Sequence, residues 1–361
     1  MSQQAAPGSR AGKGSPVPVE QQRRIADPPV QGEPIRGNLA ALDLGTNNCR
    51  LLIARPEGDG FVIVDAFSRI VRLGEGLAAT GRLSDAAIER TISALSVCAD
   101  KLRRRRVVLA RSVATEACRQ AANGAAFVKR VHDETGIMLD IISAREEARL
   151  AVLGCRSLLE PGDGAALIFD IGGGSTELAL LDGNTANPGI ADWQSAPWGV
   201  VSLTEAVGRH DDSPEGRAAA YAAMRETMRA AFAPFVARLL ADGPKDGTVR
   251  LLGTSGTVTT LATVFLGLQR YDRAAVDGLI VPAADMRAIA ARLAGMSMTE
   301  RTGLPCIGEE RADLVVAGCA ILESILDIWP ADRLGVADRG IREGILRALL
   351  DSHAMKHGRG R

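Results

Sequence analysis

The chain carries the same strand–turn–strand pattern twice, about 127 residues apart. In the first copy an apolar run ends at Asp43 and a polar turn follows at 45–48. In the second copy an apolar run ends at Asp170, and the turn at 172–175 contains three consecutive glycines. A repeat this widely spaced is not a solenoid period. It predicts two similar lobes, each opening with a β-hairpin, and the cleft between them becomes the candidate site.

Length and charge narrow the class of protein. A chain of 361 residues is long for one hydrophobic core, and 46% hydrophobic residues exclude disorder throughout. Basic and acidic residues both number 43, so no overall field attracts nucleic acid or a membrane, and neither is expected as a partner. Any anion must therefore be bound by local features.

The spacing of the cysteines and the length of the apolar segments indicate the cellular compartment in which the protein is expected. The six cysteines include no CxxC pair, which argues against a zinc site or a disulfide framework. The sequence contains no run of 18 apolar residues and no signal-peptide pattern at its N-terminus. We therefore expect a cytoplasmic protein.

Composition divides the chain into four segments. Residues 1–37 are rich in Pro, Gly, Gln, Ser and Arg and are expected to form a disordered tail. Residues 38–162 are expected to form the first lobe and residues 163–352 the second. Residues 353–361 are short, basic and glycine-bearing, and are expected to fray.

Helical and strand patterns alternate after the first hairpin. An amphipathic helix capped by Ser84 precedes a buried strand at 107–113, and Ser143 opens a helix that runs to about Leu158. After the second hairpin, a helix at 214–241 leads to a strand at 249–252. This alternation predicts an α/β fold.

Four strands lead directly into glycine-containing loops. Such loops leave backbone N–H groups free, and several pointing inward form a nest for phosphate oxygens. The alternative is that these are ordinary tight turns, for which three consecutive glycines would be entropically costly. The candidate phosphate-binding residues are Gly45, Thr46, Asn47, Asn48, Gly172, Gly173, Gly174, Ser175, Thr176, Gly253, Ser255, Gly256 and Thr257.

Two aspartates occupy corresponding places in the hairpins. A pseudo-twofold relation between the lobes would bring Asp43 and Asp170 to the floor of the cleft. Oxygen ligands beside phosphate predict Mg²⁺, which is usually held through one or two carboxylates, water and substrate oxygens. Glu177 would lie across the second hairpin and could add a ligand. The alternatives are a turn cap for Asp170 and a solvated strand position for Glu177.

Glu147 and Arg119 are the candidate catalytic residues. Ser143 and Glu146 match a capping box, so Glu146 would reach back to the backbone of Ser143. Glu147, one position later, could deprotonate a water attacking phosphorus, or could simply be a favourable charge at the helix N-terminus. Arg119 lies just beyond a predicted strand end, where a guanidinium could bind phosphate or pair with a surface neighbour.

Five segments carry sequence motifs, and they are Asp43–Asn47, Ile142–Arg149, Asp170–Glu177, Gly253–Thr257 and Asp338–Gly344. Together these motifs resemble the exopolyphosphatase/guanosine pentaphosphate phosphohydrolase (Ppx/GppA) phosphatase family, over about residues 39–350. The resemblance implies the actin-like ATPase superfold, with two ribonuclease-H-like lobes and a cleft between them, and hydrolysis of a terminal phosphoanhydride. It also implies a short form without the C-terminal helical domain of longer relatives, and it leaves a homodimer open.

The resemblance assigns roles to single residues. By similarity Glu147 is the base that activates water and Arg119 contacts the phosphates. Asp170 and Glu177 organise Mg²⁺ by similarity, Asp43 is added to them from the repeat described above, and a monovalent cation such as K⁺ is left open. The glycine turns would hold successive phosphoryl groups.

The expected activity is that of an exopolyphosphatase, a hydrolase of phosphorus-containing acid anhydrides that releases orthophosphate from the end of inorganic polyphosphate. The nearest alternative substrate is guanosine pentaphosphate (pppGpp), which would lose its 5′ γ-phosphate. A sugar or acetate kinase of the same superfold would need an acceptor pocket, and a water-activating Glu147 argues against it. A non-catalytic sensor of the alarmone or of polyphosphate is a lesser alternative.

Overall fold

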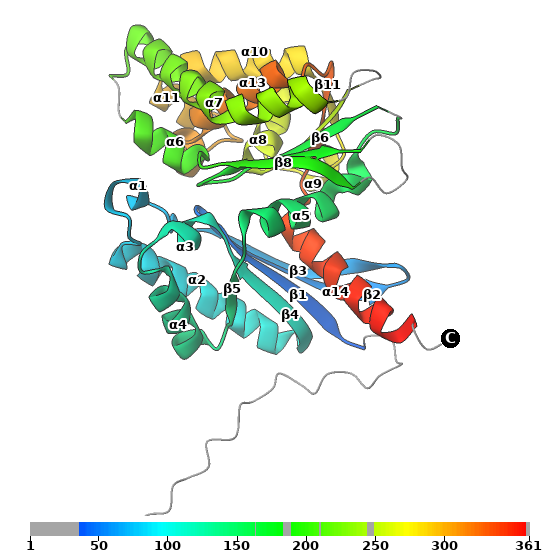
Figure 1. The fold of residues 1–361 in the computed structure, drawn as a ribbon. Coiled ribbons are helices and arrows are strands. Elements are labelled where there is room, and N and C mark those ends of the chain that lie inside the picture. Colours follow the sequence, from blue (N-terminus) through cyan, green and yellow to red (C-terminus); the bar gives the residue numbers. More distant parts are fainter. Residues whose placement is uncertain (1–35, 163, 183–188, 209–210, 244–248, 359–361) are drawn as a thin grey trace, which may run out of the picture.

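The computed structural model describes residues 36–358, apart from 163, 183–188, 209–210 and 244–248. The expected N-terminal tail therefore lies almost wholly outside the described residues, and β1 begins at Asn38. Two sheets with helices packed against them form two lobes stacked one above the other (Figure 1). Among the described residues, no helix combines the length and apolarity needed to cross a membrane.

The first lobe contains a five-stranded sheet with the order β3-β2-β1-β4-β5. The first three strands form an antiparallel meander, while β4 and β5 continue the sheet parallel to β1. The N-cap of α2 is the predicted Ser84, whose Oγ accepts from the backbone N–H of Ala87. The bounds are β1 (Asn38–Leu44), β2 (Asn48–Glu57), β3 (Gly60–Ile70), α1 (Leu77–Thr80), α2 (Asp85–Arg104), β4 (Val107–Ala114), α3 (Glu116–Gln120), α4 (Gly124–Thr135), β5 (Leu139–Ile141) and α5 (Ala144–Cys155), followed by the 3₁₀ turn η1 (Arg156–Leu158).

The second lobe repeats this topology in a six-stranded sheet with the order β10-β11-β9-β6-β7-β8. Strands β8, β7, β6, β9 and β11 correspond in order to the five strands of the first sheet, so the duplicated hairpin does mark a duplicated lobe. The bounds are β6 (Ala166–Ile171), β7 (Thr176–Leu181), β8 (Ile190–Ala196), α6 (Val200–Val207), α7 (Pro214–Asp242), β9 (Arg250–Thr254), α8 (Gly256–Phe265), α9 (Arg273–Val276), β10 (Ile280–Pro282), α10 (Ala283–Gly295), α11 (Met298–Thr302), α12 (Glu309–Ala312), α13 (Val315–Ile328), β11 (Arg333–Ala337) and α14 (Ile341–Gly358).

Helix α14 corrects the expected domain boundaries. It follows β11 of the second lobe but returns to the first sheet, where Ile345 and Leu346 share a buried cluster with Leu39 and Leu52 (Figure 1). The range 163–352 is therefore wrong for the last helix, whose apolar side chains cover a face of the first sheet. The helix continues to Gly358, past the expected boundary at residue 352; residues 359–361 lie outside the described residues.

Candidate active site

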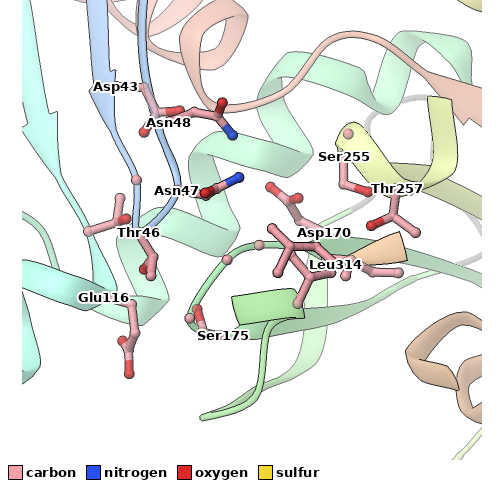
Figure 2. A pocket seen from close by; sticks show the side chains of 18 of the residues that line it. Asp43, Thr46, Asn47, Asn48, Glu116, Asp170, Ser175, Ser255, Thr257 and Leu314 are labelled. Carbon is pink, nitrogen blue, oxygen red and sulfur yellow. The ribbon is translucent and has the colours of Figure 1, made fainter. Parts of the chain in front are cut away.

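A cavity between the lobes gathers most of the predicted site residues. It is bordered by the turn after β1, the turn after β6, the start of α8 and the start of α5. Asp170 and Asn47 face each other across it, with Ser255 and Thr257 to one side and Thr46 and Glu116 to the other (Figure 2). The predicted residues that line it are Asp43, Gly45, Thr46, Asn47, Asn48, Glu147, Asp170, Gly172, Gly173, Gly174, Ser175, Ser255, Gly256 and Thr257.

The glycine triplet allows two loops to approach each other. None of the three glycines has a left-handed backbone. A Cβ atom on Gly174 would instead lie 2.6 Å from Oγ1 of Thr46, and one on Gly173 would lie 3.1 Å from the backbone nitrogen of Asn47. These glycines are therefore required by the close packing of the first-lobe turn on the second-lobe turn.

The turns present backbone donors to the cavity. Among the described residues, the N–H groups of Thr46, Asn47, Gly173 and Gly174 donate to no backbone carbonyl or side chain. The N-terminus of α8 adds a helix end, with Ser255 as its cap accepting from the N–H of Val258 at 3.2 Å. Free N–H groups and a helix N-terminus are the features that bind phosphate oxygens.

Ser255 carries backbone strain at this point. Its φ is 150°, a region that residues with a side chain rarely adopt. The strained residue lines the cavity and caps α8 at the same time. Strain of this kind is typical of functional sites, where the surrounding structure holds an unfavourable backbone in place.

Buried carboxylates surround the cavity floor. Asp170 is paired in register with Glu177, and Asp43 with Arg50. Burial, reinforced by the charge of Glu147, raises the pKa of Asp170 to about 7. Burial and the neighbouring Asp170 raise the pKa of Glu177 to about 7 as well. Burial also raises the pKa of Asp43. Each of these groups would ionise more readily beside a cation.

The oxygen donors fit Mg²⁺. Two buried acceptor oxygens, Oδ1 of Asp43 and Oδ1 of Asn47, have no hydrogen-bond partner among the described residues. Within the same part of the chain, no three His, Cys, Asp or Glu side chains converge to hold a metal by themselves. Mg²⁺ does not need such a cage, because it is usually held by one or two carboxylates together with water and substrate phosphates.

Glu177 lies behind the cavity wall, on the strand next to that of Asp170. Its side chain is 3% exposed and does not line the cavity. Its Oε1 accepts from Oγ of Ser195 at 2.9 Å, behind Asp170 on the neighbouring strand. The geometry therefore makes Asp43 and Asp170 the candidate direct ligands, with Glu177 behind them.

Glu147 lines the cavity, but its neighbour Arg119 does not. Nη1 of Arg119 donates to Oε2 of Glu147 at 2.7 Å and to the carbonyl of Ile142 at 2.8 Å, and its guanidinium also contacts Glu116. The guanidinium of Arg119 therefore orients the Glu147 carboxylate. The predicted contact between Arg119 and phosphate finds no support in this arrangement.

Glu146 does not complete the expected capping box. The Ser143 Oγ accepts from the backbone N–H of Glu146, as predicted. The Glu146 carboxylate pairs with Arg111 and Arg149 instead of reaching back to the backbone of Ser143. Opposite charges within reach compete with the cap, because a charged partner gives a stronger hydrogen bond than a backbone N–H.

Two other predicted phosphate ligands lie away from the cavity. The Thr176 hydroxyl donates to the carbonyl of Trp198 at 2.7 Å, and the Thr176 side chain is fully buried. Gly253 lies within β9, where a Cβ atom would approach the Phe169 ring to 2.4 Å. Neither residue lines the cavity, so the structure lends these two predictions no support.

Sequence reasoning missed the cations of the cavity. Arg50 and Arg311 line it, and Nη2 of Arg50 lies 3.7 Å from the Cβ position of Gly256 in the opposite lobe. Alternation along β2 could have found Arg50, which lies two residues after Asn48. Arg311 lies in the short helix α12, and no motif in its neighbourhood indicated that it would reach the cavity.

Comparison with known proteins agrees with this geometry. A model of the Ppx/GppA phosphatase family matches residues 52–353. The chain belongs to the Ppx/GppA phosphatase family. Two relatives from this family are "Exopolyphosphatase 2" from Mycobacterium tuberculosis, 33% identical over 86% of this chain and 98% of its own length, and "Guanosine-5'-triphosphate,3'-diphosphate pyrophosphatase" from Aliivibrio fischeri, 27% identical over 86% of this chain and 59% of its own length.

Solved structures share the fold. The Ppx/GppA family member from Aquifex aeolicus is 29% identical, with a TM-score of 0.69 over 88% of this chain and 98% of its own. An exopolyphosphatase from Cytophaga hutchinsonii is 25% identical, with a TM-score of 0.75 over 87% of this chain and 98% of its own. Together with the duplicated sheet topology, these matches confirm the α/β fold of two lobes that share one strand order.

Proposed function

We propose that this Ppx/GppA protein is a phosphoanhydride hydrolase, and specifically an exopolyphosphatase that releases orthophosphate from the end of inorganic polyphosphate with Mg²⁺. The supporting observation is that three turns of the kind that binds phosphate, at 45–48, 172–175 and 255–257, line one cavity between the lobes. Glu147 lines the same cavity. Free N–H groups, Arg50 and Arg311 suit a chain of phosphoryl groups better than a neutral substrate.

The reaction follows from positioning and charge. The turns hold the terminal phosphoryl group, and Glu147 holds a water in line with the anhydride bond and accepts its proton. Arg119 fixes one oxygen of Glu147, which leaves the other oxygen for the water. Mg²⁺, which Asp43 and Asp170 would hold, neutralises phosphoryl charge when bound. No covalent intermediate is needed, because the anhydride is already activated.

The two cavity arginines give a testable consequence. Arg50→Ala and Arg311→Ala are each expected to lower kcat/KM for tripolyphosphate about tenfold or more, because each removes a charge-assisted contact worth at least about 1.5 kcal/mol. Steady-state kinetics measure this effect. Arg130→Ala, which removes an exposed arginine paired with Glu89 and Glu134, is the matched control. Equal rates in all three variants would remove these arginines from the binding site.

A second candidate substrate is pppGpp, which the name of the Aliivibrio fischeri relative supports. Initial rates of orthophosphate release from tripolyphosphate, long-chain polyphosphate and pppGpp, at equal concentrations with and without Mg²⁺, separate the two. We expect the highest rates on polyphosphate and none without Mg²⁺. A hundredfold preference for pppGpp would reverse the order, and release from none of the three would contradict the proposed hydrolase.

A further inference from the structure

The segment between β3 and α1, residues 71–76, is packed on the first-lobe phosphate turn. The N–H groups of Val71 and Arg72 both donate to the carbonyl of Asn47, at 2.9 and 3.0 Å, and that of Gly74 donates to the carbonyl of Thr46 at 2.9 Å. A Cβ atom on Gly74 would lie 2.3 Å from Cγ2 of Thr46. Three backbone hydrogen bonds and this close approach therefore hold the segment against the turn.

The same segment is tied to the second lobe at two points. Nη1 of Arg72 lies 3.1 Å from Oδ2 of Asp313, and the N–H of Gly76 donates to Oε1 of Glu205 in α6 at 2.9 Å. Asp313 is two residues beyond Arg311 and adjoins Leu314, and both of these line the active-site cavity. The two ties thus connect the loop that carries Asn47 with the segment that carries Arg311.

The backbone of Arg72 supports a role beyond surface pairing. Its φ is 46°, in the left-handed region that non-glycine residues rarely adopt. The hydrogen bond from its N–H to Asn47 helps to hold this conformation, from which the side chain reaches the opposite lobe. An unfavourable backbone that persists next to an active site is typical of a functional constraint.

We propose that Arg72, Asp313 and Glu205 form a clasp that positions the two lobes around the substrate. The proposal rests on the proposed function, because it assigns these positioning residues to the phosphate cavity. With the clasp formed, the Asn47 side and the Arg311 side of the cavity are held together. Without the clasp, a smaller fraction of the protein has the two lobes held in this arrangement. The apparent affinity for substrate then falls in proportion to that fraction. None of the three residues lines the reacting end of the cavity beside Glu147, so the chemical step is unaffected.

Kinetics of single and exchanged variants test the clasp. Asp313→Asn, which removes the charge that pairs with Arg72, and Glu205→Ala, which removes the acceptor of the Gly76 N–H, are each expected to raise KM for tripolyphosphate about fivefold and to leave kcat within about twofold. The double exchange Arg72→Asp with Asp313→Arg is expected to restore KM, since aspartate tolerates a left-handed backbone. The control is Asp192→Asn, which breaks the Arg238 pair of similar exposure within the second lobe. Additive effects without recovery, or an equal change in the control, would overturn the clasp.

Amide hydrogen exchange provides a readout that needs no turnover. In the full chain without substrate, exchange across 71–76 is expected to be about fivefold faster in Asp313→Asn and Glu205→Ala than in the wild type or Asp192→Asn. Unchanged exchange in both clasp variants would overturn the proposal. If the protein hydrolysed no phosphoanhydride, the proposed function would fail, while this measurement would still decide whether the clasp exists.

Discussion

Glu147→Gln is expected to lower kcat for orthophosphate release by about 10³-fold, because the variant loses the group that accepts a proton from the attacking water. Glutamine keeps the side-chain length and an oxygen that can accept from Arg119, so the packing at the start of α5 is preserved. Binding of tripolyphosphate, measured by titration calorimetry, is expected to change by less than about threefold, because the turns and cavity arginines remain.

Glu146→Gln is the matched control for this experiment. Glu146 is the preceding residue of the same helix, but its carboxylate pairs with Arg111 and Arg149 rather than lining the cavity. Its kcat is expected to stay within about twofold of wild type. Unchanged turnover in Glu147→Gln would refute the assigned mechanism. If the wild type bound tripolyphosphate but did not hydrolyse it, the interpretation as a non-catalytic sensor would gain support.

Asp170→Asn is expected to separate activity from stability. Orthophosphate release is expected to fall by about 10³-fold, because the variant loses a carboxylate proposed to hold Mg²⁺. Added Mg²⁺ should not restore the rate. We also expect the melting temperature of the metal-free variant to rise, because the substitution removes a buried negative charge. A variant that melts at a higher temperature is folded, so unfolding could not explain its loss of activity.

The sign of the stability change follows from the raised pKa. Burial raises the pKa of Asp170 from 3.8 to about 7, so the stability that its neutral form contributes is fully present below about pH 4 and is lost as pH rises through about 7. At about pH 8 the wild type carries a buried negative charge that asparagine lacks. The variant should therefore be more stable in the absence of Mg²⁺, by on the order of 2 kcal/mol.

Thermal unfolding in chelator, at about pH 5 and about pH 8, measures this difference. Asp65→Asn is the control, and its stability change is expected to have the opposite sign. Hydrogen bonds from Lys101 and Arg105 lower the pKa of Asp65. Removal of this carboxylate should therefore destabilise the fold at neutral pH. A lower melting temperature for Asp170→Asn at about pH 8 would show that Asp170 is a structural residue of the hairpin.

The sequence predicted the features that are local. Both hairpins could be found because an apolar strand, an aspartate and a glycine turn lie together in the chain, as at Asp170. The position of Glu147 could be found because Ser143 marks where α5 begins. Their meeting at one cavity followed from the repeat, since equivalent turns of two similar lobes face each other.

Features that depend on distant contacts could not be predicted in this way. The return of α14 to the first sheet depends on an uncovered apolar face about three hundred residues earlier in the chain. The pairing of Arg119 with Glu147 depends on the distance between two helices, which spacing along the sequence does not give. Arg311 and the Arg72–Asp313 pair depend on how the lobes approach each other.

A crystal structure of Glu147→Gln with tripolyphosphate and Mg²⁺ tests the central claim most directly. We predict that the phosphoryl chain lies between the turns at 45–48, 172–175 and 255–257, with its terminal phosphorus nearest residue 147. A chain bound outside this cavity, or one whose end points away from residue 147, would contradict the account.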